Sequence, residues 1–186
     1  MNLDQRMTAG AAAISERAES EPAGLSVGSQ FPGFRFPDLT GRTRSLSDFE
    51  GKPVLLIHWS TECSFCVAVG RDLALLEDAF FKARVQLVLL SRSDASSTGK
   101  QAKQLGLKCP ILLAKDGSEA LELFSDFGTP AAYLLEERGR VADPLVVGSN
   151  GILRLARQLA ASTEKKRLPG ERAMAQSRRP VARDGQ

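Results

Sequence analysis

The sequence predicts an α/β protein, a three-layer sandwich around a mixed central sheet. Three short apolar runs, at 54–59, 85–91 and 109–114, each precede a segment with helical character. This alternation is typical of parallel strands covered by helices. Strand pairs before the first run and after the third add antiparallel hairpins, so the expected order is ββ, β-α, β-α, β-α, ββ, α.

The length of the chain bounds its organisation. A chain of 186 residues can bury one substantial core and is short for two. No apolar run approaches the roughly 18 residues that span a bilayer. We expect one domain at 27–161, a polar leader at 1–26 that is partly helical or disordered, and a disordered basic tail at 162–186.

The positive charge of the chain is concentrated in that tail. Residues 162–186 hold seven basic and three acidic residues, or +4, which leaves −1 for the rest of a chain whose formal charge is +3. The tail has no aromatic residues and no helical or strand periodicity. This pattern predicts a solvated tail and no nucleic-acid partner.

The first elements are a hairpin and a buried strand. Apolar and polar residues alternate over 34–46, and Thr40-Gly41 supplies the turn. Residues 45–53 are expected to form a short turn or helical loop. The continuous apolar run at 54–59 then suits a parallel strand that is covered on both faces.

Helices follow the buried strands. Residues Cys66, Val69, Leu73, Leu76 and Phe80 form one stripe of a helix that extends to about residue 82. A second strand at 85–91 leads to a helix at 96–106, with Gly106 as its stop, and 109–114 is a third strand.

The last part of the domain predicts two helices around a hairpin. Ser118 can cap a helix over 119–128. Segments 131–137 and 140–148 flank a turn at Arg138-Gly139, and a final helix at 150–162 has an apolar face.

Two cysteines lie where the first buried strand leads into a helix. Cys63 and Cys66 are separated by two residues, so they can close a small disulfide. Unpaired N–H groups at a helix start favour an anion, which lowers the pKa of Cys63 and makes it the nucleophile. Cys66, one turn further along, is the resolving cysteine.

Other interpretations of this pair remain open. A structural zinc site needs about four ligands, and the remaining candidates, His58 and Cys109, do not form a paired ligand motif. We therefore expect no metal and no other cofactor. Two inert core cysteines are the second alternative.

The chain resembles a known family in three separate segments. These are Trp59 with the Cys63-Ser-Phe-Cys66 motif, the stretch GTPAAYLLEERGRV around Pro130, and the opening VGSQFPGFRFPDLTGRTRSLSDFEGKPVLLIHW. The pattern is similar to thioredoxin-fold redoxins of the TlpA and ResA type, and within them to MauD, an accessory protein of methylamine dehydrogenase maturation. The resemblance covers about residues 26–161 and implies a thioredoxin-like fold with an N-terminal hairpin extension.

The resemblance also implies a substrate-binding surface. Pro130 would be the cis-proline facing the disulfide, and Thr129 before it would offer backbone hydrogen bonds to an extended substrate. Trp59 would flank the active site; a core tryptophan at the end of a strand is the alternative.

Two features depart from the family pattern. Glu62 stands before Cys63, where an aromatic residue is common, and its carboxylate would raise the pKa of the thiol. Ser64-Phe65 replaces the familiar Gly-Pro between the cysteines. The redox potential therefore stays open.

Two further residues are expected to be structural. Neighbouring strand residues point to opposite faces, so at most one of His58 and Trp59 lies over the helix of the cysteines. Cys109 is expected to be a buried small apolar residue, with a third redox partner as its alternative.

The leading functional hypothesis is a thiol-disulfide oxidoreductase acting on protein thiols, with an electron-exchange partner. A peroxiredoxin-like peroxidase is the enzymatic alternative. Ser60 meets that family's requirement for Thr or Ser three residues before the cysteine, but Leu56 stands where the family has Pro. A redox-inactive binding module in a maturation complex is the alternative from another class.

The family resemblance implies an extracytoplasmic, membrane-associated setting, although no signal peptide is visible in the sequence. A membrane anchor upstream of the given start would agree with it, and a cytoplasmic location is the alternative. We expect a monomer.

Overall fold

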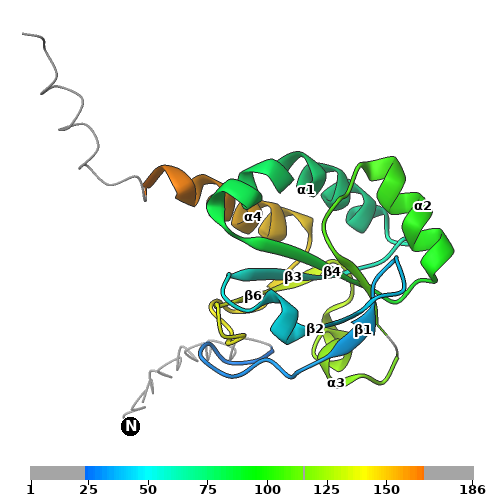
Figure 1. Ribbon diagram of the computed structural model, residues 1–186, viewed down its shortest axis with the longest axis horizontal. Helices are drawn as coiled ribbons and strands as arrows, with labels where there is room; N and C mark the ends of the chain where they lie inside the picture. Colours follow the sequence, from blue (N-terminus) through cyan, green and yellow to red (C-terminus); the bar gives the residue numbers. More distant parts are fainter. Residues whose placement is uncertain (1–23, 115, 166–186) are drawn as a thin grey trace, which may run out of the picture.

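The computed structural model describes residues 24–114 and 116–165, which form three layers with a five-stranded sheet in the middle (Figure 1). The elements in chain order are β1 (Arg35–Pro37), β2 (Thr43–Ser45), the 3-10 helix η1 (Leu46–Phe49), β3 (Val54–Trp59), α1 (Ser64–Ala83), β4 (Gln86–Ser91), α2 (Ala95–Leu105), β5 (Ile111–Leu113), α3 (Glu119–Glu122), the 3-10 helix η2 (Ser125–Phe127), β6 (Ala131–Leu135), β7 (Val146–Val147) and α4 (Ser149–Lys165).

The central sheet is mixed, as the sequence predicts. Its strand order is β5-β4-β3-β6-β7. Strand β3 pairs in parallel with β4 and antiparallel with β6. All six residues of β3 are buried, which accounts for the continuous apolar run. Because β3, β4 and β5 are parallel, the residues that follow them gather at one edge of the sheet.

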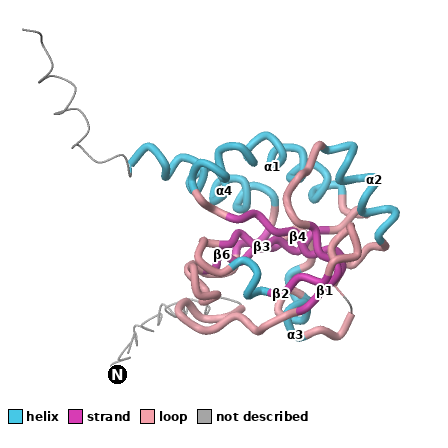
Figure 2. The backbone as a smooth tube through the Cα atoms, in the orientation of Figure 1, coloured by secondary structure: helices cyan, strands magenta, loops and turns pink. Residues whose placement is uncertain are grey.

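Helices α1, α2 and α4 cover one face of the sheet (Figures 1 and 2). The predicted stripe of α1 is buried there, except for the half-buried Leu76. Helix α2 ends at Gly106, where φ is +75°, so the predicted stop is confirmed.

The other face is covered by the β1–β2 hairpin, η1 and α3 (Figure 2). Its core is aromatic: the rings of Phe31, Phe124 and Tyr133 lie with centroids 5.2–6.4 Å apart in tilted or edge-on arrangements. Edge-to-face packing of this kind adds to the area that the rings bury. The two faces of the sheet therefore have cores of different character.

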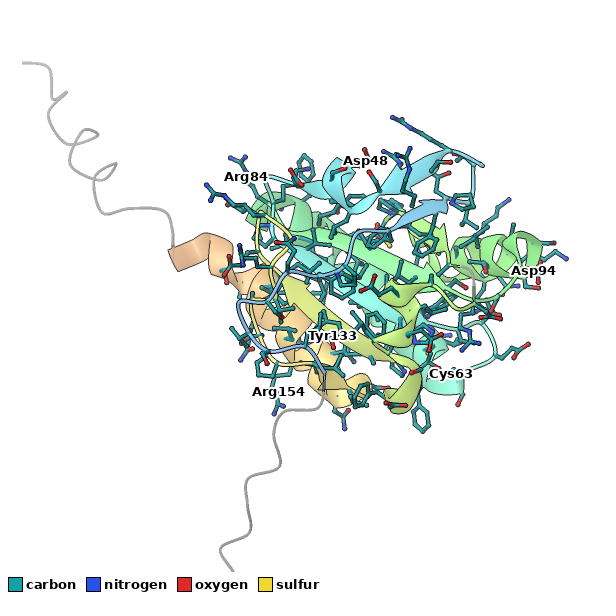
Figure 3. The ribbon with its side chains drawn as sticks, turned by 90° about the horizontal axis from the view of Figure 1, so that it is seen from below. Asp48, Cys63, Arg84, Asp94, Tyr133 and Arg154 are labelled. Carbon is teal, nitrogen blue, oxygen red and sulfur yellow. The ribbon has the colours of Figure 1, made fainter. Side chains whose placement is uncertain are left out.

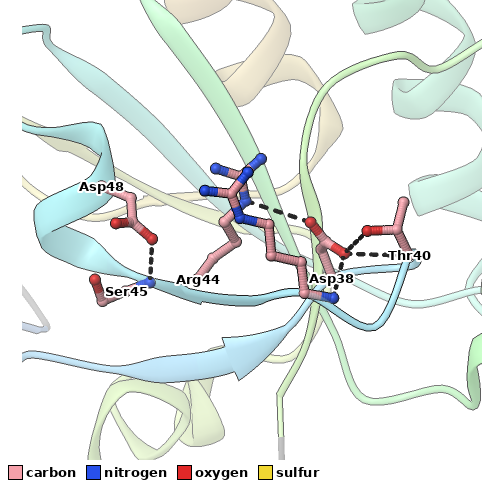
Figure 4. A network of polar contacts seen from close by, with 6 residues as sticks. Asp38, Thr40, Arg44, Ser45 and Asp48 are labelled. Atoms are coloured by element: carbon pink, nitrogen blue, oxygen red, sulfur yellow. Dashed lines mark hydrogen bonds and ion pairs between the residues drawn. The ribbon is translucent and has the colours of Figure 1, made fainter.

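Asp38 organises the turn of the β1–β2 hairpin (Figure 4). One carboxylate oxygen accepts from the backbone N–H groups of Thr40 and Arg42 at 2.9 and 3.1 Å, and the other accepts from Arg44 Nε at 3.3 Å. Gly41 has a φ of +82°, so the turn predicted at Thr40-Gly41 is confirmed. A bridge between Asp38 and Leu112 attaches the hairpin to β5.

Two elements are shorter than predicted. Residues 119–128 form α3 and η2 rather than one helix, and the side chain of Ser118 makes no capping hydrogen bond. The second arm of the last hairpin is interrupted, because it bridges β6 at Val141 and pairs again only at 146–147. Pro144 lies in the intervening stretch and has no N–H for a ladder.

The ends of the chain fall largely outside the described residues. The predictions for the leader concern 1–26, of which 1–23 are outside, and those for the tail concern 162–186, of which 166–186 are outside. Helix α4 continues to Lys165. No helix in the described ranges combines the length and apolar character needed to cross a bilayer.

Candidate active site

Cys63 lies at the N-terminus of α1, at the edge of the sheet where β3 ends. It is the N-cap residue of the helix, with extended backbone angles, and its Sγ accepts a hydrogen bond from Cys66 N at 3.3 Å. Figure 3 shows Cys63 and Arg84 at opposite ends of α1. A helix N-terminus presents unpaired N–H groups, so the predicted environment of a thiolate is present here.

Thr129 lies against Cys63 from the other side of the site. The Cys63 thiol donates to the Thr129 carbonyl oxygen at 3.3 Å, and the peptide bond between Thr129 and Pro130 is cis. Thr129 is half-buried, whereas Pro130 is buried and accepts a hydrogen bond from Gly148 N at 2.9 Å. The structure therefore brings together the two cysteines and the loop that the sequence analysis singled out.

The two thiols have opposite electrostatic environments. Burial opposes ionisation of Cys63, but interactions with the side chains of Cys66 and Thr129 and with the backbone of Cys66 and Phe65 outweigh it and lower the pKa of Cys63. Burial raises the pKa of Cys66 to about 12, and the neighbouring Cys63 adds to the effect. The pKa of Cys63 is thus lowered although Glu62, an exposed residue, stands next to it. At neutral pH the nucleophile of this pair is Cys63.

Trp59 corrects one expectation. Its side chain is fully buried, so it does not form part of a substrate-binding surface. Its Nε1–H donates to the carbonyl oxygen of Cys66 at 2.8 Å, which fixes the first turn of α1 against the sheet. The core interpretation of Trp59 agrees with this geometry, because the ring supports the cysteine pair from behind.

His58 points to the opposite face of the sheet from Trp59. Its ring packs against Phe124 with centroids 5.4 Å apart, and neither ring nitrogen has a hydrogen-bond partner among the described residues. Burial lowers the pKa of His58 to about 4, and the charge of Arg92 adds to this shift. His58 is therefore neutral at pH 7, and its ring lies on the face of the sheet that α1 does not cover.

Cys109 lies just before β5, at the edge of the sheet opposite to Cys63. Its backbone N–H and that of Lys108 donate to the same Glu77 carboxylate oxygen, at 2.9 and 2.8 Å. Burial and the Glu77 charge raise the pKa of the Cys109 thiol well above its ordinary value. A direct role as a third redox partner is excluded by this placement, because the two ends of a parallel strand separate the thiols.

Two alternatives to a redox pair, a metal site and a peroxidase site, depend on residues near Cys63 and Cys66. Among the described residues, no group of three or more His, Cys, Asp or Glu side chains is placed to hold a metal ion. Ser60 Oγ accepts from Glu62 N at 3.2 Å rather than from Cys63. The hydrogen bonds of the Cys63 sulfur involve Cys66 N and the Thr129 carbonyl.

The sequence analysis missed a group of hydroxyls at the same edge. Thr61, two residues before Cys63, contacts Ser93, which follows β4. The signal was present in the Ser- and Thr-rich stretch after the second buried strand, since the carboxyl ends of neighbouring parallel strands meet at one edge.

The fold and the paired cysteines at the start of α1 define the class, a thioredoxin-like oxidoreductase. A solved structure of similar fold is the thioredoxin domain of a thiol-disulfide oxidoreductase from Bacteroides vulgatus, with a TM-score of 0.63, 23% identity, and coverage of 73% of this chain and 99% of that one. The chain belongs to the AhpC/TSA family, whose model matches residues 27–144.

The sequence relatives include thiol-disulfide oxidoreductases and a protein named as a peroxiredoxin. The thiol-disulfide oxidoreductase ResA of Bacillus thuringiensis subsp. konkukian is 28% identical over 118 residues, covering 63% of this chain and 68% of ResA. The thioredoxin-like protein YneN of Bacillus subtilis is 30% identical over 124 residues, covering 64% and 71%. The bcp protein of Helicobacter pylori, named as a peroxiredoxin, is 28% identical over 130 residues, covering 69% and 85%.

Proposed function

We propose that this chain exchanges disulfides with protein thiols through Cys63 and Cys66. The observation that carries the proposal is the asymmetry of the pair: the half-buried Cys63 accepts from a helix N–H and has a lowered pKa, whereas Cys66 is fully buried and has a pKa of about 12. The relatives named as thiol-disulfide oxidoreductases support the same chemistry.

In the reducing direction, the Cys63 thiolate attacks one sulfur of a substrate disulfide. The substrate S–S bond breaks, a mixed disulfide forms, and the other substrate sulfur leaves as a thiolate. Cys66 then attacks Cys63 Sγ, and its proton passes to the departing thiolate. Two electrons move from the pair to the substrate, and the oxidised pair runs the same steps in reverse.

Thr129 is the residue that we expect to contact the substrate backbone. It is half-buried and adjacent to the Cys63 sulfur, whereas the following Pro130 is buried and shapes the loop from within. When Cys63 ionises before its attack, it loses the thiol proton that the Thr129 carbonyl accepts in this structure. That carbonyl is then free to accept an N–H from the substrate chain.

The test is a redox titration in glutathione or dithiothreitol buffers, with free thiols trapped for mass spectrometry. The expected result is one two-electron transition confined to Cys63 and Cys66, unchanged in the control variant Cys109→Ala. A potential near roughly −270 mV would indicate a reductant, and one near roughly −120 mV an oxidant. Absence of a disulfide at every poise would overturn the proposal.

A thiol peroxidase is the second candidate, because the bcp relative is named as a peroxiredoxin. In that reaction the Cys63 thiolate would attack a peroxide oxygen, the O–O bond would break, and Cys66 would condense with the resulting sulfenic acid to release water. Peroxide consumption in a thiol-regenerated assay distinguishes the two. Turnover of peroxide much faster than turnover of a protein disulfide would favour the peroxidase.

A further inference from the structure

A chain of hydroxyl groups joins the loop before Cys63 to β4 and α2. Thr61 Oγ1 donates to Ser93 Oγ at 2.8 Å, and the backbone N–H of Thr61 approaches the same oxygen at 3.5 Å. Ser93 thus contacts the β3–α1 loop through both the side chain and the backbone of Thr61. This loop is the one that places Cys63 at the start of α1.

Ser93 is itself held by two buried hydroxyls. Its N–H donates to Ser91 Oγ at 3.2 Å, and its carbonyl oxygen accepts from Thr98 Oγ1 at 3.4 Å. Ser91 Oγ and Thr98 Oγ1 lie 3.1 Å apart, and both residues are fully buried. One arrangement of protons satisfies all these contacts: Ser91 donates to Thr98, and Thr98 donates to the Ser93 carbonyl.

The location of these groups matters for the cysteine pair. Ser91 is in register with Trp59 at the ends of β4 and β3, and Trp59 holds the Cys66 carbonyl. The helix turn is therefore fixed through Trp59, while the loop on the other side of Cys63 is fixed through Thr61 and Ser93. Buried hydroxyl networks that are fully hydrogen-bonded specify a single geometry.

We infer that Thr61 and Ser93 are positioning residues for Cys63, and that the buried Ser91–Thr98 pair holds Ser93 in place for this task. The inference rests on the proposed function, because it concerns how the attacking sulfur is presented. Without the Thr61–Ser93 hydrogen bond, the loop can rotate. The Cys63 sulfur then spends less time between Cys66 N and the Thr129 carbonyl.

The experiment compares Thr61→Val, which preserves shape, with Ser93→Ala, the double variant, and Thr61→Ser, which restores a hydroxyl. The matched control is Ser96→Ala, an exposed serine in the first turn of α2. The readouts are the Cys63 pKa, from the pH dependence of thiol alkylation, and the rate of disulfide exchange with a small disulfide.

We expect each single variant to slow exchange about fivefold, the ratio carried by one ordinary hydrogen bond, and to raise the Cys63 pKa. The double variant should be no slower than Ser93→Ala, because that single change already removes both contacts of the Ser93 hydroxyl with Thr61. Thr61→Ser and Ser96→Ala should behave as the wild type. The inference would be overturned if the double variant slowed exchange by the product of the two single effects. It would also be overturned if folded Thr61→Val kept the wild-type Cys63 pKa, or if Thr61→Ser exchanged as slowly as Thr61→Val.

Failure of the proposed function is distinguishable from failure of this inference. If wild-type protein formed no Cys63–Cys66 disulfide, the proposed function would fall, whereas the effect of Thr61→Val on the Cys63 pKa would still be measurable. If the wild type exchanged disulfides and the Thr61 and Ser93 variants did so equally fast, only the positioning role would be disproved.

Discussion

The two faces of β3 treat their buried polar groups differently. Trp59 faces the helices, and its one N–H donates to the Cys66 carbonyl. His58, the preceding residue, faces the aromatic core, and both of its nitrogens lack a partner among the described residues. The β3 side chain on the face of the cysteine pair thus has its hydrogen-bond partner, whereas the β3 side chain on the other face is an imidazole without one, which costs stability.

The largest loss of stability should come from removing the Trp59 ring on the helical face. Trp59→Ala removes a fully buried ring and its hydrogen bond to Cys66, so we expect a loss of about 3–5 kcal/mol in the free energy of unfolding. Urea denaturation measures it. Trp59→Phe, which keeps a ring and loses the N–H, separates the two contributions. A loss below about 1 kcal/mol for Trp59→Ala would show that this face is not specified by the ring.

The buried His58 imidazole on the other face should make stability depend on pH. The pKa of His58 is about 4 in the folded protein, below the ordinary value of 6.5, so the unfolded chain binds a proton that the folded chain does not. Stability from this group is complete above pH 6.5 and falls as the pH drops towards 4, by about 3 kcal/mol. Because His58 is the only histidine in the chain, the difference between wild type and His58→Phe at pH 7 and pH 4 isolates it. An equal pH dependence in both proteins would contradict the expectation.

A smaller effect should follow from changing the hairpin that covers the His58 face. Asp38→Asn keeps the shape of the side chain but removes the charge that faces Arg44 and weakens its hydrogen bonds in the turn. We expect a loss of about 1–2 kcal/mol at pH 7, because hydrogen bonds to charged groups exceed neutral ones. The hydrogen bond from the Thr40 hydroxyl, together with those from Arg44 and Arg42, lowers the pKa of Asp38, so the difference from wild type should shrink as the pH falls through the carboxyl range. A difference that persists there would assign the loss to packing.

The smallest effect sharpens the comparison on the helical face. A Cβ on Gly70 would lie 2.9 Å from Leu105 Cδ1 and 3.5 Å from Trp59 Nε1. Leu105 can shift its flexible end, and alanine gains about 1 kcal/mol of helix propensity over glycine. We therefore expect Gly70→Ala to change stability by less than about 1 kcal/mol in thermal or urea unfolding. A much larger loss would mean that neither Leu105 nor Trp59 can shift to make room for the added methyl group.

Much of this architecture follows from local patterns. The continuous apolar run at 54–59 predicts β3, the stripe of apolar residues at spacings of three and four from Cys66 predicts α1, and Gly106 marks the end of α2. The broken second arm of the last hairpin and the short α3 were not predictable in the same way. Their residues match several conformations, and tertiary contacts decide among them.

The candidate site shows the same division. Cys63, Cys66 and the Thr129-Pro130 loop stand out as a motif and by resemblance to a family. The burial of Trp59, the acceptance of the Cys63 proton by the Thr129 carbonyl and the role of Ser93 depend on which residues meet across separate strands. No spacing within one segment encodes those meetings.

The outer strands of the sheet influence how readily two copies of the protein can associate. Strands β5 and β7 stand at the two ends of the strand order and have three and two residues, and the hairpin already bridges β5 at Leu112. Short or covered outer strands offer little backbone to another copy, which opposes fibre-like association. Pairing through these outer strands is therefore not a route by which a second copy would cover the half-buried Cys63.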